Sequence, residues 1–98
     1  MYGTVARFRV KSGADQKLKQ QFEDFEKLNV PGYVGSMLYK MDQNPEEYYL
    51  AVVFTDKDAY VSNANSPEQD ARYREMVALM DGEPEWHDGE VVYARPTG

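Results

Sequence analysis

The chain has 98 residues, a formal net charge of −6 and no cysteine. We expect a single domain over residues 1–98, without disulfides, thiolate metal sites or a cysteine nucleophile. The acidic balance argues against nucleic-acid binding, because phosphate contacts require Lys and Arg. No apolar run approaches the roughly 20 residues that a membrane-spanning helix needs. No basic and apolar leader precedes the first strand-like segment, so we expect a cytoplasmic protein without membrane contact.

The first half of the chain predicts a strand, a helix and a second strand. Residues 4–10 alternate at period two. One face carries Thr4, Ala6, Phe8 and Val10, and the other carries Val5, Arg7 and Arg9. Residues 14–28 repeat apolar side chains at helical spacing, and Pro31 ends this helix because it disfavours helical geometry in the residue before it. Residues 33–41 are a second strand by composition.

The middle of the chain predicts a central strand followed by an interrupted helix. Residues 48–54 form a continuous apolar and aromatic run, as expected for a strand covered on both faces. Residues 55–58 can cap a short helical segment through Tyr60, and residues 63–65 interrupt it.

The remainder predicts a second helix and a last strand. Ser66 is the expected N-cap, with Pro67 at the first helical position and Gln69 completing the capping box. Gly82 supplies the left-handed position that ends this region. A turn at residues 88–89 then leads into the last strand, residues 90–95.

This order of elements predicts an α+β, ferredoxin-like βαββαβ fold. Right-handed crossovers place both helices on one face of a four-stranded antiparallel sheet. The other face would expose Arg7 and Arg9, together with one of the two apolar faces of residues 48–54. A patch of that size usually marks an interface or a ligand site, so we expect a homodimer that packs sheet against sheet.

The chain resembles the antibiotic biosynthesis monooxygenase (ABM) family of dimeric α/β-barrel proteins. The resemblance lies in residues 5–13, in the strand-to-helix passage of residues 49–60, and in Ser66–Pro67 before Tyr73. It implies the dimeric α/β-barrel form of the fold and a cofactor-free oxygenase acting on a polyphenolic or quinol substrate. The family also includes haem-degrading enzymes and members without an assigned activity.

The haem-degrading branch fits this sequence poorly. Where that branch carries a tryptophan, this chain has Asn63, and residues 73–77 hold no histidine for the iron. His87, the single histidine, lies beyond the second helix, so the resemblance argues against haem degradation. One histidine without cysteine also argues against a transition-metal site. We therefore expect no metal and no cofactor.

Two residues are candidates for catalysis. His87 could act as a general base oriented by Asp88 or Glu85, or it could belong to a solvated turn. Arg7 alternates onto the uncovered face beside Arg9, where guanidinium groups could hold a carboxylate or phenolate. The alternative for both arginines is an ion pair with an acidic residue across the sheet or interface.

A second set of residues could bind an aromatic substrate. Tyrosines and a tryptophan offer apolar walls with polar handles, and an asparagine could orient a carbonyl or bound oxygen. These candidates are Tyr39, Tyr49, Asn63, Tyr73 and Trp86, with Tyr60 and Tyr93 as further pocket tyrosines. The alternative is packing in the core or interface for the aromatic residues, and a helix break for the asparagine.

Two functions of different classes follow. The first is a cofactor-free oxygenase or isomerase acting on a small aromatic or quinol-type compound. The second is a non-catalytic dimeric binding or stress-related protein on the same fold, because one scaffold hosts many activities. An RNA-recognition module of the same strand order conflicts with the acidic balance. An acylphosphatase would need a Gly-rich anion loop that residues 11–14 do not supply.

Overall fold

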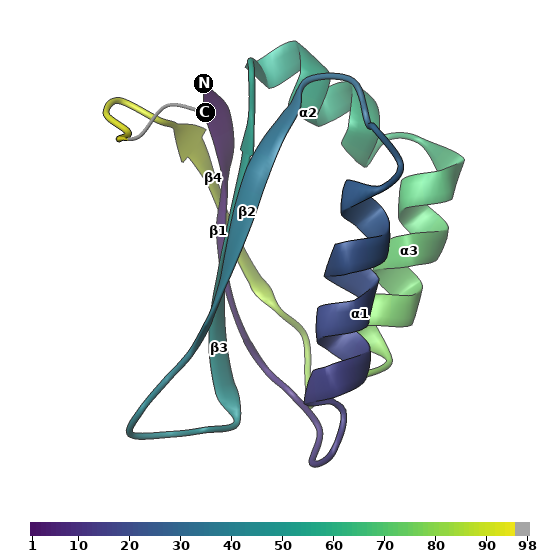
Figure 1. Ribbon diagram of the computed structural model, residues 1–98, viewed down its shortest axis with the longest axis vertical. Coiled ribbons are helices and arrows are strands. Elements are labelled where there is room, and N and C mark those ends of the chain that lie inside the picture. The colour runs from purple at the N-terminus through teal and green to yellow at the C-terminus, as the bar shows by residue number, and fades with distance from the viewer. Residues whose placement is uncertain (96–98) are drawn as a thin grey trace.

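The computed structural model describes residues 1–95, which form one four-stranded sheet and three helices (Figure 1). The strand order is β2-β3-β1-β4, and every neighbouring pair is antiparallel. The elements are β1 (Tyr2–Arg9), α1 (Asp15–Glu26), β2 (Tyr33–Lys40), β3 (Glu47–Phe54), α2 (Lys57–Ala64), α3 (Pro67–Val77) and β4 (Glu85–Glu90).

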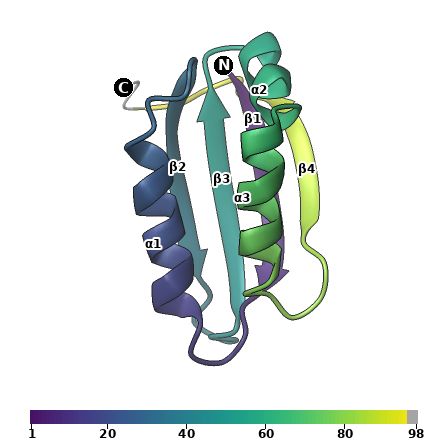
Figure 2. The ribbon, with the colours of Figure 1, turned by 90° about the vertical axis from the view of Figure 1, so that its right-hand side faces the viewer.

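The helices lie on one side of the sheet and leave the other side uncovered (Figure 1). Seen from the helix side, α1 lies over β2, α3 lies over β1, and β3 is visible between the two helices (Figure 2). The short helix α2 sits at one end of the sheet. The predicted α+β, ferredoxin-like fold is confirmed, with the second helical region divided into α2 and α3.

The two faces of β1 behave as the alternation predicts. Thr4, Ala6 and Phe8 are buried under the helices, while Val5 and Arg7 are exposed on the uncovered face. Gly3 allows β1 and β3 to approach closely at their paired ends, because a Cβ there would overlap the carbonyl group of Val52.

Both C-terminal helices begin at a side-chain cap. Asp56 accepts a hydrogen bond from the backbone N–H of Ala59 at 2.8 Å, and Ser66 accepts one from that of Gln69 at 3.1 Å. The predicted capping box is only half formed. The side-chain oxygen of Gln69 accepts from Nε of Arg72 at 3.0 Å instead of bonding back to the cap residue.

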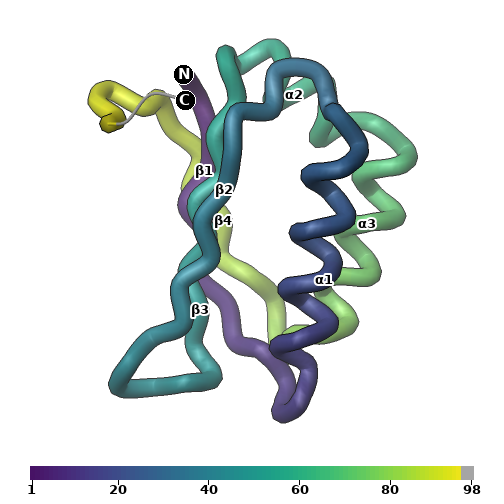
Figure 3. The backbone as a smooth tube through the Cα atoms, viewed as in Figure 1, coloured from purple at the N-terminus to yellow at the C-terminus, as the bar shows by residue number. Residues whose placement is uncertain are grey.

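The last strand lies earlier in the chain than residues 90–95, so that prediction was wrong. β4 is Glu85–Glu90, and the predicted turn at Asp88–Gly89 lies inside it, where Asp88 pairs with Thr4 and Gly89 with Gly3. Pairing with residues 2–7 of β1 outweighs the local turn signal. Residues 91–95 form no strand and leave the sheet on its uncovered side (Figure 3).

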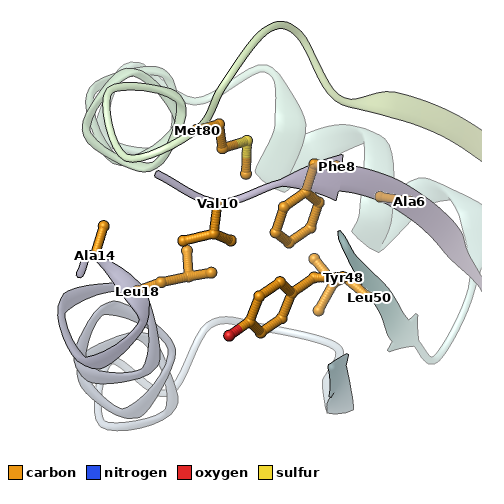
Figure 4. Close-up of a cluster of buried hydrophobic side chains, with 8 residues drawn as sticks. All are labelled: Ala6, Phe8, Val10, Ala14, Leu18, Tyr48, Leu50 and Met80. Carbon is orange, nitrogen blue, oxygen red and sulfur yellow. The ribbon is translucent and has the colours of Figure 1, made fainter. Parts of the chain in front are cut away.

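The main buried cluster lies at one end of the space between sheet and helices, and Phe54 is buried at the other end. The centre of the cluster is Leu18 of α1, which packs with residues from the end of β1 and the start of β3 (Figure 4). The cluster comprises Ala6, Phe8, Val10, Ala14, Leu18, Tyr48, Leu50 and Met80. Because these residues gather where α1 begins, the later turns of α1 and the first turns of α3 are not packed together by the same cluster.

Candidate functional site

A pocket of about 550 Å³ lies between the sheet, α1 and α3. This volume is in the range of small-molecule sites, which are mostly apolar with a few polar groups. The wall from α1 includes Gln21, Phe22 and Phe25, with Leu28 just beyond the helix, and that from α3 includes Gln69, Arg72, Tyr73 and Met76. The sheet contributes Thr4, Leu50, Val52, Phe54 and Trp86, and α2 contributes Tyr60 and Asn63.

One wall of the pocket is a series of aromatic rings in edge contact. Phe25 of α1 meets Tyr33 with ring centroids 5.0 Å apart, and Tyr33 meets Phe54 at 5.7 Å. Phe54 in turn meets Tyr60 of α2 at 5.7 Å. Edge contacts between aromatic rings are favourable and hold the rings in defined orientations. These residues therefore form a preorganised apolar wall on which a planar molecule could pack.

The opposite wall joins β4 to α3 through a single hydrogen bond. Nε1 of Trp86 donates to the hydroxyl of Tyr73 at 3.2 Å, and the ring centroids lie 5.9 Å apart. Trp86 is the one tryptophan of the chain. Its fluorescence is thus a site-specific reporter for this pocket.

Tyr60 is the pocket tyrosine with the most perturbed hydroxyl. It donates to Oδ1 of Asp88 at 2.9 Å. Burial and then the hydrogen bond to Asp88 raise the pKa of Tyr60 to about 12, while the nearby Thr4 hydroxyl, which makes no well-formed hydrogen bond, acts in the opposite direction. Tyr60 is therefore a neutral phenol near pH 7 and is suited to hydrogen bonding rather than to proton abstraction.

The rim of the pocket carries charged side chains from both helices. Arg72 of α3 lies with its guanidinium carbon 5.2 Å from the ring centroid of Phe25 on α1, a cation–π contact that links the two helices. Three carboxylates also line the pocket, those of Asp24, Asp70 and Glu75. The rim therefore combines one cation with three carboxylates around an apolar interior.

The structure divides the sequence-predicted site residues between the two faces of the sheet. Asn63, Tyr73 and Trp86 line the pocket. Directly paired residues of antiparallel strands share a face. The pairs Tyr39–Tyr49, Tyr49–Arg7 and Val5–His87 therefore place Tyr39, Tyr49, Arg7 and His87 on the uncovered face.

Arg7 makes the ion pairs that the sequence suggested as its alternative role. Its Nε donates to Glu47 at 2.9 Å and its Nη1 donates to Glu85 at 3.2 Å. These contacts raise the pKa of Arg7 and lower that of Glu47. The guanidinium therefore already has carboxylate partners within its own chain, and the catalytic roles of Arg7 and His87 stay predictions.

Sequence reasoning missed two polar residues of the pocket, Thr4 and Gln21. The hydroxyl of Thr4 and the side-chain oxygen of Gln21 are buried and have no well-formed hydrogen bond to any of the described residues 1–95. Gln21 follows Leu18 by three residues and precedes Phe25 by four, so it lies on the edge of the apolar stripe of α1. That spacing was the sequence feature that could have pointed to Gln21 as a pocket residue.

Residues 1–95 contain no group of three or more His, Asp or Glu side chains placed to hold a metal ion. Within the same residues, none of the helices combines the length and the hydropathy needed to cross a bilayer.

The sequence matches the family model for antibiotic biosynthesis monooxygenase over residues 1–79. The chain belongs to the ABM family. The predicted resemblance to this family is thus confirmed. No curated protein matches the chain.

Solved structures of similar fold agree with the ABM assignment. A mutant of SnoaB, a cofactor-independent oxygenase from Streptomyces nogalater, has a TM-score of 0.79 and 23% identity, covering 97% of this chain and 96% of its own. A conserved protein from Methanosarcina mazei Go1 has a TM-score of 0.75 and 19% identity, covering 90% and 89%. An antibiotic biosynthesis monooxygenase has a TM-score of 0.73 and 12% identity, covering 95% and 100%. At these identities the likeness shows the fold alone.

Proposed function

We propose that this ABM protein is a cofactor-independent oxygenase whose substrate is a small aromatic or quinol-type compound bound between the sheet, α1 and α3. The observation that carries the proposal is the pocket of about 550 Å³ with its preformed aromatic wall. Membership of the ABM family and the fold shared with SnoaB, described as a cofactor-independent oxygenase, support it.

In such a reaction the substrate supplies all the electrons. A quinol and O₂ give a hydroxyquinone and water: one oxygen atom enters the ring, and the other leaves with the two hydrogens lost by the substrate. The protein would bind the ring against Phe25, Tyr33 and Phe54, orient it by hydrogen bonds, and exclude bulk water. The carboxylates of Asp24 and Glu75 at the rim offer an exit for the proton.

For His87 to act as the base and Arg7 to hold the substrate anion, the substrate would have to bind outside this pocket. Both residues lie on the uncovered face, so they could reach a substrate only in a cavity enclosed when a second sheet packs there. Oxygen uptake that is unchanged in His87→Ala and Arg7→Ala would remove them from the mechanism.

Oxygen uptake with a blocked pocket tests the proposal. With a panel of quinols that includes 1,4-dihydroxynaphthalene, we expect the protein to accelerate oxygen consumption above the autoxidation rate. Met76→Trp fills the pocket and should abolish the acceleration. Met41→Trp, the same exchange in the β2–β3 hairpin away from the pocket, should retain it. Equal activity in both variants would place the chemistry elsewhere.

A second candidate is the non-catalytic binding protein. It is favoured by two observations: His87 lies outside the pocket, and the raised pKa of Tyr60 keeps this residue protonated at neutral pH. The described pocket residues therefore offer neither an imidazole nor a phenolate that could act as a base at neutral pH. This candidate predicts that a quinol quenches the fluorescence of Trp86 but is never turned over.

We also propose that the protein is a cytoplasmic homodimer that buries the uncovered sheet face. This face exposes Val5 (51% exposed) and Met37 (60% exposed) and also carries Tyr39 and Tyr49. A contiguous apolar patch of this kind typically marks an interface, and two copies can cover each other in a closed C2 arrangement. Residues 91–95 leave the sheet on this side (Figure 3), and the exposed Tyr93 among them could extend the contact.

A further inference from the structure

Two residues that line the pocket each carry a buried side-chain oxygen for which residues 1–95 offer no hydrogen-bond partner. Thr4 is only 5% exposed, and its hydroxyl on the helix face of β1, which lies near the hydroxyl of Tyr60, makes no well-formed hydrogen bond within residues 1–95. The side-chain oxygen of Gln21, on α1, is also buried and unpaired. The two residues come from different walls of the same pocket.

Unpaired buried polar groups are unusual because burial removes their bonds to bulk water. Each such group in a native protein requires an explanation, and in a ligand pocket the simplest one is a bond that forms when the ligand enters. Many of the other polar residues of the pocket already form hydrogen bonds within the protein, so they are less available to bind a ligand. These internal pairs are Tyr33–Ser36, Tyr60–Asp88, Trp86–Tyr73 and Arg72–Gln69.

We propose that Thr4 and Gln21 are specificity-determining residues that select a ligand with two separated oxygen functions. A ligand hydroxyl donates to the side-chain oxygen of Gln21, and a second ligand oxygen accepts from the hydroxyl of Thr4. A planar ring with a hydroxyl at each end meets both requirements, whereas a hydrocarbon of the same shape meets neither. This inference rests on the proposed function in that it uses the same pocket and ligand class.

Thr4→Val and Gln21→Met test the inference because each removes the polar atom and nearly conserves the side-chain volume. The probes are 1,4-dihydroxynaphthalene, kept under nitrogen, and 1,4-dimethylnaphthalene, which has the same outline without hydroxyls. Calorimetry gives the dissociation constants, and the fluorescence of Trp86 verifies that the probe enters the pocket. Gln16→Met is the matched control, because Gln16 is exposed on the same helix and lies outside the pocket lining.

We expect each variant to weaken binding of the diol by about tenfold, the usual contribution of one hydrogen bond in a desolvated site. Binding of the dimethyl compound should change by less than about twofold, since it makes neither bond. Gln16→Met should bind both probes as the parent protein does. A preference for the diol that persists in Thr4→Val and Gln21→Met would overturn the inference while leaving the proposed function intact. A parent protein that binds neither probe would overturn both.

Thermal unfolding of the free protein supplies a second readout. Thr4→Val should melt at the same temperature as the parent or higher, because the hydroxyl that it removes has no partner. A clear fall in melting temperature would mean that this hydroxyl is already bonded in the free protein, and the inference would fail for Thr4.

Discussion

Replacing Met37 by Asp is expected to dissociate the proposed homodimer. Met37 lies on the uncovered face of β2 and is 60% exposed in the single chain. Complete burial of a methionine side chain contributes about 1.5–3 kcal/mol, so burying the exposed part contributes about 1–2 kcal/mol. A C2 interface contains the residue twice, which doubles the loss to about 2–4 kcal/mol. The dimer dissociation constant should therefore rise about 30- to 700-fold, before any cost of burying the new carboxylate.

Sedimentation equilibrium over a range of micromolar concentrations measures this constant directly. Val61→Asp is the control, because Val61 is 40% exposed but lies on α2, away from the uncovered face. It should leave the dissociation constant unchanged. A parent protein that sediments as a single chain, or equal weakening in both variants, would refute the reasoning about this face.

Three further predictions concern stability, each measured by urea unfolding. Leu18→Ala should lower the free energy of unfolding by about 2–5 kcal/mol, because Leu18 is fully buried, and a loss below about 1 kcal/mol would contradict the described core. Ser66→Ala should cost about 1 kcal/mol through loss of the α3 cap, whereas Ser66→Asp should not. The raised pKa of Tyr60 stabilises the fold below pH 10, and this contribution is lost as the pH rises to about 12. Because Tyr60 is only partly buried, the loss should be about 1 kcal/mol. It should be absent in Tyr60→Phe, and an equal loss in that variant would exclude Tyr60 as its source.

Local patterns predicted most of the fold. The alternation along β1 assigned Thr4 to the helix face and Arg7 to the uncovered face, because one buried face imposes a strict period of two. Ser66 marked the start of α3, because its cap needs only residues that are close in sequence. The last strand was misplaced because its position depends on pairing with β1, about 80 residues earlier in the chain, which no local turn signal contains.

The site was harder to predict than the fold for the same reason. Trp86 and Tyr73 are residue types that often line pockets, but only the register of β4 against β1 brings Trp86 to the helix face beside Tyr73. The same register turns its neighbour His87 to the uncovered face. Gln21 was missed because a glutamine on a helix carries no motif, and its significance appears only when its buried oxygen is found without a partner.

The central claim is that the ligand site lies between the sheet and the helices. Heteronuclear NMR of the protein titrated with 1,4-dihydroxynaphthalene under nitrogen tests it most directly. We predict that the indole N–H of Trp86 and the methyl group of Met76 shift with the same dissociation constant, while the imidazole of His87 does not. Shifts confined to His87 and Met37 on the uncovered face, with Trp86 unaffected, would contradict the account.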